Sequence, residues 1–194
     1  MRRVCVFCGS NAGARPAYAD AARALGAVLA ARRIGLVYGG GRVGLMGVLA
    51  DAALAAGGEV VGVIPRALAT KEIAHDGVSE LRVVASMHER KAEMAALADG
   101  FVALPGGFGM FEELLEVVTW AQLGLHAKPT GILNVAGYFD AFHALVERAI
   151  EERFVHPGYR ALLTYAENAE DLLDAMRRWR SPAGFRKRLT LAES

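Results

Sequence analysis

Two glycine-rich turns are the segments of this sequence best suited to hold a phosphate. They span residues 39–47 and 105–113, and each opens a predicted helix. Glycine lets backbone N–H groups approach phosphate oxygens, and the free amides and dipole of a helix N-terminus favour an anion. One such turn is explained equally well by tight turning and close packing, but two in one domain favour a small nucleotide.

The turns lack the features of two common nucleotide sites. Neither is followed by Gly-Lys-Ser or Gly-Lys-Thr, so we expect no P-loop and no kinase or ATPase. The dinucleotide fingerprint is missing too, because the turn after the first predicted strand lacks the further glycines that NAD binding requires. The candidate phosphate or packing glycines of residues 39–47 are Gly39, Gly40, Gly41 and Gly44.

Charged side chains accompany the second turn. Glu112 and Glu113 fall in the predicted first turn of its helix, where carboxylates also serve simply to complement the helix dipole. Arg90 and Lys91 begin the helix after the fourth predicted strand, which should emerge at the same edge of the sheet. Cations oppose the dipole at a helix N-terminus, so this conflict indicates a functional pair, with a solvated basic pair as the alternative.

The elements that must position these residues alternate regularly. Apolar runs rich in β-branched residues predict strands at residues 4–7, 35–38, 60–64, 81–85, 101–104, 130–133 and 162–165. Periodic stretches predict helices at about residues 17–33, 45–56, 88–98, 110–125, 138–153 and 169–180. We therefore expect an α/β fold with a Rossmann-like, doubly wound parallel sheet flanked by helices.

One domain should contain all of these elements. It spans residues 1–181, and a C-terminal tail over residues 182–194 follows, where the periodicity ends. The helix at residues 110–125 is expected to face the sheet with an apolar stripe of Phe111, Leu114, Leu115, Val118 and Leu123. Asn168 is expected to cap the last helix.

Net charge, the N-terminal apolar run and the cysteines predict which partners the protein binds and where in the cell it is found. The formal net charge is +1, so we expect no nucleic-acid partner. The apolar run near the N-terminus is too short for a signal peptide or a membrane span, which indicates a cytoplasmic protein with no membrane partner. Cys5 and Cys8 should point to opposite faces of a strand, and further zinc ligands are missing, so neither a metal nor a cofactor is expected.

Six separated segments together resemble one enzyme family. They are residues 38–47, 64–68, 87–91, 105–113, 119–124 and 128–129, and the resemblance extends from the first strand to about Phe154. The sequence is similar to the LONELY GUY (LOG) family of cytokinin riboside 5′-monophosphate phosphoribohydrolases. That resemblance implies hydrolysis of the N-glycosidic bond of a purine nucleoside 5′-monophosphate, which releases the free base and ribose 5-phosphate. Nothing in the sequence marks a pyridoxal-phosphate lysine, so a lysine decarboxylase is not expected.

The resemblance also implies roles for particular residues. Arg90 and Glu113 correspond to the catalytic pair: the carboxylate stabilises positive charge on the ribose and orients or deprotonates water, and the arginine fixes it by paired hydrogen bonds. The substrate contacts that it implies are Glu72, Lys91, Gly107, Phe108, Gly109, Met110, Phe111, Glu112 and Thr119. A homodimer with the site near the subunit interface is implied as well.

One departure from the family pattern bears on substrate binding. The pattern Pro-Gly-Gly-x-Gly-Thr-x-x-Glu has its threonine replaced by Met110, which removes a hydroxyl donor for the phosphate. Two alternatives follow from the sequence. One is a nucleosidase for ordinary AMP, and the other is a non-catalytic nucleotide or molybdenum-cofactor carrier of the same fold.

Overall fold

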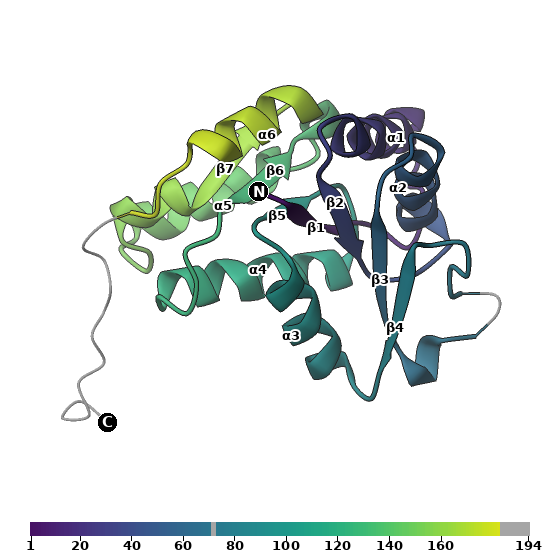
Figure 1. The fold of residues 1–194 in the computed structure, drawn as a ribbon. Coiled ribbons are helices and arrows are strands. Elements are labelled where there is room, and N and C mark those ends of the chain that lie inside the picture. The colour runs from purple at the N-terminus through teal and green to yellow at the C-terminus, as the bar shows by residue number, and fades with distance from the viewer. Residues whose placement is uncertain (71–72, 183–194) are drawn as a thin grey trace.

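The computed structural model describes residues 1–70 and 73–182. Its centre is a seven-stranded sheet in the order β4-β3-β2-β1-β5-β6-β7, and every neighbouring pair of strands is parallel (Figure 1). The strands are β1 (Arg3–Phe7), β2 (Gly35–Tyr38), β3 (Val60–Pro65), β4 (Glu80–Val84), β5 (Phe101–Ala103), β6 (Thr130–Leu133) and β7 (Leu163–Ala166). Each predicted strand is confirmed to within one residue at either end, as is the doubly wound fold.

The strand order reverses direction at β1. The chain adds β2, β3 and β4 outward on one side of β1 and then returns to place β5 on its other side. The carboxyl ends of β1 and β5 therefore form the topological switch point, which is where ligands bind in open α/β sheets. The central strands β2 and β3 are buried along their whole length, as continuous apolar runs predict for a sheet covered on both faces.

Helices cover both faces of the sheet. The helices are α1 (Pro16–Ala31), α2 (Gly44–Ala55), α3 (Met87–Leu97), α4 (Phe108–Gln122), α5 (Asp140–Glu151) and α6 (Ala169–Arg178). Apolar residues of α1, α2 and α6 form one buried cluster with the sheet, and those of α3 and α4 form the other. Figure 1 shows the same division, with α1, α2 and α6 above the strands and α3 and α4 below them. Cys5 and Cys8 are buried in different clusters, so the two thiols point to opposite faces as predicted.

The predicted orientation of α4 is partly wrong. The residues it buries are Met110, Glu113, Leu114 and Val117, whereas the predicted core residues Leu115 and Leu123 remain 49% and 47% exposed. Both sides of this helix carry apolar side chains at helical spacing, so hydrophobicity alone does not fix which side meets the sheet. The helix also begins earlier than predicted, at Phe108, which moves Glu112 and Glu113 from its first turn into its second.

The C-terminal part follows the predicted pattern as far as the structure describes it. Asn168 caps α6, because its side chain accepts a hydrogen bond from the backbone N–H of Asp171 at 2.9 Å. The predicted tail lies outside the described residues from residue 183 onward. No helix in residues 1–70 or 73–182 is both long and apolar enough to cross a membrane.

Candidate active site

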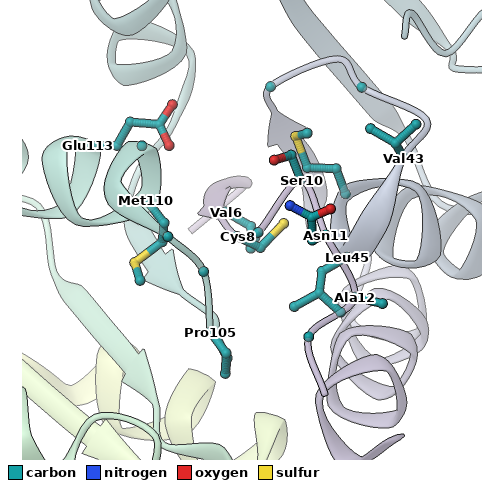
Figure 2. A pocket seen from close by; sticks show the side chains of 18 of the residues that line it. Val6, Cys8, Ser10, Asn11, Ala12, Val43, Leu45, Pro105, Met110 and Glu113 are labelled. Atoms are coloured by element: carbon teal, nitrogen blue, oxygen red, sulfur yellow. The ribbon is translucent and has the colours of Figure 1, made fainter. Parts of the chain in front are cut away.

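A cavity of about 520 Å³ opens at the switch point. Its walls come from the turns after β1, β2, β3, β5 and β6, together with the starts of α2 and α4 and the side chain of Arg90 on α3. Figure 2 shows Glu113 and Met110 on one side and Ser10, Asn11 and Val43 across from them. Of the predicted site residues, the cavity brings together Gly39, Gly41, Arg90, Gly107, Phe108, Gly109, Met110 and Glu113.

The turn at residues 105–109 presents backbone amides to this cavity. Gly107 is the N-cap of α4, and no side chain at this position accepts a hydrogen bond from the first turn. The helical hydrogen bonds begin with the N–H of Phe111, which donates to the carbonyl of Gly107 at 3.1 Å. The amides of Phe108, Gly109 and Met110 thus precede the helical hydrogen-bond ladder. A Cβ atom added at Gly107 or Gly109 would meet nothing within 4 Å, so open space lies beside these amides. The helix start can accept an anion.

The turn at residues 39–47 has a different structural role. The N–H of Leu45, in the first turn of α2, already donates to the carbonyl of Gly9 at 3.0 Å. A side chain at Gly44 would overlap the backbone of Ser10 and Asn11, and one at Gly47 would overlap the carbonyl of Arg42. Gly44 therefore lets the turns after β1 and β2 pack closely, and Gly47 lets the turn after β2 pack against the start of α2, as the packing interpretation of this turn requires.

Arg90 reaches the cavity from the fourth position of α3. Ser86 caps the helix by accepting a hydrogen bond from the N–H of Glu89 at 3.1 Å, and the Glu89 carboxylate accepts from the N–H of Ala85 at 2.7 Å. This variant of a capping box fixes where α3 starts and hence where Arg90 stands. The sequence interpretation missed it, although the Ser-x-x-Glu spacing was available as a signal.

The guanidinium of Arg90 is held mainly by backbone carbonyls. Its Nε donates to the carbonyl of Val63 at 3.1 Å and its Nη2 donates to that of Gly39 at 3.2 Å. Nη1 lies 3.4 Å from Oε1 of Glu113. The paired hydrogen bonds expected between arginine and carboxylate are thus replaced by one longer ion pair, while Nε and Nη2 each donate to a carbonyl, in β3 and in the turn after β2 respectively. These carbonyls also solvate a cation that the helix dipole disfavours.

The carboxylate of Glu113 is largely buried from solvent. Burial beneath the cavity raises its pKa to about 7, against the opposing effect of the nearby Arg90 guanidinium, and the negative charge of Glu112 adds to the rise. At neutral pH the side chain therefore exchanges readily between its two protonation states. A group with this property is suited to proton transfer and to stabilising a transient positive charge.

Within residues 1–70 and 73–182, the remaining predicted contacts do not line this cavity. Lys91 forms ion pairs with Glu112 and with Glu116, the latter at 3.0 Å, and so links α3 to α4. Thr119 is exposed, and Phe111 is partly buried against the core. Gly40 has a φ of 73° and faces Ile64 and Leu81. Glu72 lies outside the described residues.

Tyr138 is a cavity residue that sequence reasoning missed. Its hydroxyl donates to the carbonyl of Gly106, and its ring packs edge-on against that of Tyr18 with centroids 5.7 Å apart. It thereby supports the turn whose amides face the cavity. Its place just after β6, at the carboxyl edge of the sheet, was the signal that could have found it.

An apolar wall completes the cavity opposite α4. It is formed by Val43, Leu45, Met46, Leu68 and Ile73. Such a wall suits a flat, largely apolar ring, while the start of α4 suits a phosphate and Glu113 lies in the same cavity. Fold and site together define a Rossmann-like α/β protein built to hold a nucleotide beside a buried glutamate–arginine pair.

Comparison with known proteins gives the family. Residues 46–176 match the family model described as "Possible lysine decarboxylase". The chain is 50% identical over 173 residues to the cytokinin riboside 5′-monophosphate phosphoribohydrolase LOG7 of Arabidopsis thaliana, which covers 89% of this chain and 80% of that protein. It is 51% identical to LOG1 of the same plant over 89% of this chain and 81% of that protein. The chain belongs to the LOG family of cytokinin riboside 5′-monophosphate phosphoribohydrolases.

Solved structures with lower identity share the fold. The molybdenum cofactor carrier protein of Chlamydomonas reinhardtii superposes with a TM-score of 0.69 at 21% identity, over 92% of this chain and 98% of that chain. The molybdenum cofactor binding protein of Rippkaea orientalis gives a TM-score of 0.68 at 19% identity, over 91% and 96% of the two chains. At this level of identity the likeness concerns the fold.

Proposed function

We propose that this chain hydrolyses the N-glycosidic bond of cytokinin riboside 5′-monophosphates. Water adds to the anomeric carbon of the ribose, the bond from that carbon to the purine nitrogen breaks, and the bonding electrons leave with the base. The base takes up a proton, and ribose 5-phosphate is the second product. The observation that carries the proposal is the buried Glu113–Arg90 pair in a cavity whose mouth is lined by free helix amides.

Each part of the cavity has a role in this reaction. The 5′-phosphate binds the amides at the start of α4, where the helix dipole favours negative charge. Glu113, in its ionised form, lies beside the anomeric carbon, stabilises the positive charge that develops there, and orients the attacking water. Arg90 keeps that carboxylate in place through Nη1. Neither a metal nor a cofactor takes part.

The base occupies the apolar side of the cavity. Val43, Leu68 and Ile73 offer apolar surface that an N6-isoprenoid substituent would cover and that unmodified adenine would leave in contact with water. We therefore expect a preference for the N6-substituted nucleotide over AMP.

The predicted contacts outside the cavity fit a homodimer. Thr119 follows Leu115 by four residues, and both share the outer face of α4 with Phe108. That face is apolar and unpacked in the single chain: Phe108 is 94% exposed and Leu115 is 49% exposed. A second copy covering it would bring Thr119, and Glu112 beside it, close to a neighbouring subunit. We also propose a cytoplasmic location, with which the buried free thiols of Cys5 and Cys8 are compatible.

The direct test is product analysis with matched nucleotides. Purified protein is incubated with N6-isopentenyladenosine 5′-monophosphate, with AMP, and with the nucleoside lacking the phosphate, and free base and ribose 5-phosphate are quantified by chromatography. We expect release of base from both nucleotides, faster from the N6-substituted one, and little from the nucleoside. Binding of the nucleotides without any release of base would contradict the proposal and favour a carrier.

A further inference from the structure

Gly39 lies directly beneath the guanidinium of Arg90. The Gly39 carbonyl accepts a hydrogen bond from Nη2 at 3.2 Å, and the carbonyl of Val63 accepts one from Nε at 3.1 Å. The Arg90 side chain is only 12% exposed, so these carbonyls replace the water that it has lost. With Nε and Nη2 occupied in this way, Nη1 is the nitrogen that faces Glu113.

The guanidinium occupies the space that a side chain at residue 39 would need. A Cβ atom built on Gly39 would overlap Nη2 of Arg90 and would lie 3.2 Å from Cζ. The next nearest atom, Sδ of Met46, would also be 3.2 Å away, and it belongs to a flexible side chain. Arg90 is therefore the main obstacle to a side chain at this position.

Backbone conformation does not explain the glycine. The φ angle of the adjacent Gly40 is 73°, a left-handed value that favours glycine, whereas the φ angle of Gly39 lies outside the left-handed region. Alanine can therefore adopt the backbone conformation at residue 39. This separates Gly39 from Gly40 and Gly44, which both have positive φ angles.

We propose that Gly39 is a positioning residue of the active site, whose bare Cα leaves the space in which Arg90 is held so that Nη1 points to Glu113. The expected loss of activity rests on the proposed function. The expected displacement of Arg90 rests on geometry alone. A methyl group at residue 39 would push the guanidinium off both carbonyls and away from Glu113. Small displacements of positioned catalytic groups cost on the order of 100-fold in rate.

The test is a double-mutant cycle with Arg90→Lys. Lysine keeps a positive charge but has no atom equivalent to Nη2, so the overlap with a Cβ at residue 39 is absent. We expect Gly39→Ala to lower kcat/KM on the order of 10- to 100-fold in the wild-type background and less than about twofold in the Arg90→Lys background. We also expect the midpoint of the rising limb of the pH–kcat/KM profile to move to higher pH in Gly39→Ala, because Glu113 loses its neighbouring cation.

The same cycle measured by thermal unfolding needs no substrate. Gly39→Ala should lower the Tm of the wild type and leave the Tm of Arg90→Lys unchanged, and the double variant provides this comparison even if Gly39→Ala alone folds poorly. Equal losses of Tm and of kcat/KM in both backgrounds would overturn the proposal, as would a Gly39→Ala variant with wild-type kinetics and pH profile. If no variant or wild type releases base, the proposed function fails, and the Tm cycle still decides the role of Gly39.

Discussion

Nη1 of Arg90 on α3 lies 3.4 Å from Oε1 of Glu113 on α4, and the two side chains are only 12% and 11% exposed. The pair meets because α3 and α4 start after β4 and β5, and both strands end at the same edge of a parallel sheet. The single long contact only partly compensates the burial of the carboxylate, which leaves Glu113 with its raised pKa.

Replacement of Glu113 by glutamine should change how stability depends on pH. The carboxyl group has a pKa of about 7 in the folded protein and about 4.3 when unfolded, so the native state binds more protons between these values. The free energy of unfolding of the wild type therefore falls as pH rises through this range and stays lower above it. Glu113→Gln removes that loss, so we expect it to be more stable than the wild type at pH 8 by on the order of 3–4 kcal/mol.

Urea unfolding of both proteins at pH 5 and pH 8 measures this difference. Glu116→Gln is the matched control, because it makes the same change three residues further along α4. The Glu116 side chain is a quarter exposed and pairs with Lys91. Parallel stability curves for the wild type and Glu113→Gln would show that Glu113 does not titrate in this range.

The activity should rise with pH through the pKa of Glu113. The proposed role requires the ionised carboxylate, so kcat/KM, which reports the free enzyme, should increase with an apparent pKa near 7 and level off above it. Removal of the negative charge in Glu116→Gln lowers the pKa of Glu113 and should move the midpoint to lower pH. Activity that declines above pH 7 would instead indicate that protonated Glu113 acts as a general acid toward the leaving base.

Met110→Thr should strengthen binding of the phosphate. Met110 is 2% exposed and lines the cavity at the start of α4, so a hydroxyl there would face a phosphate held by the helix amides. A hydrogen bond to a charged group contributes on the order of 1.5–3 kcal/mol, so we expect KM for the nucleotide to fall about tenfold or more. Truncation of a buried methionine should lower the Tm at the same time.

Met110→Val separates the hydroxyl from the change in size. Valine has nearly the shape of threonine and the same loss of buried side chain, but it has no donor. Steady-state kinetics of the two variants should therefore differ in KM, and an equal KM for threonine and valine would rule out the hydroxyl as a phosphate ligand.

Leu115→Glu should separate the proposed homodimer into single chains. A buried carboxylate at the outer face of α4 would oppose association without disturbing the core, because Leu115 is 49% exposed in the single chain. Light scattering after size exclusion should give the mass of two chains for the wild type and of one for the variant. Ala24→Glu, at an exposed position of α1 on the opposite side of the sheet, should remain dimeric. Identical masses for wild type and Leu115→Glu would remove this face from the interface.

The sequence predicted the sheet well because short apolar runs rich in β-branched residues alternate with longer periodic segments, a pattern typical of buried parallel strands joined by helices. The orientation of α4 was harder to predict, since apolar side chains line both of its sides and the charged Glu113 occupies a buried position. Helix spacing could not reveal that Tyr138 would reach the Gly106 carbonyl. Nor could it show that backbone carbonyls of β3 and of the β2 turn would take up two donors of Arg90, since such contacts depend on how strand ends meet in three dimensions.

The most direct test of the catalytic role of Glu113 compares turnover with binding in a single variant. Glu113→Gln keeps the size of the side chain but cannot carry the negative charge that the mechanism requires. With N6-isopentenyladenosine 5′-monophosphate at pH 8, we expect calorimetry to give a dissociation constant within a few-fold of that of Glu116→Gln. Chromatography should show base release lowered on the order of 1,000-fold or more in Glu113→Gln and unchanged in Glu116→Gln. Release of base by Glu113→Gln at the wild-type rate would contradict the account.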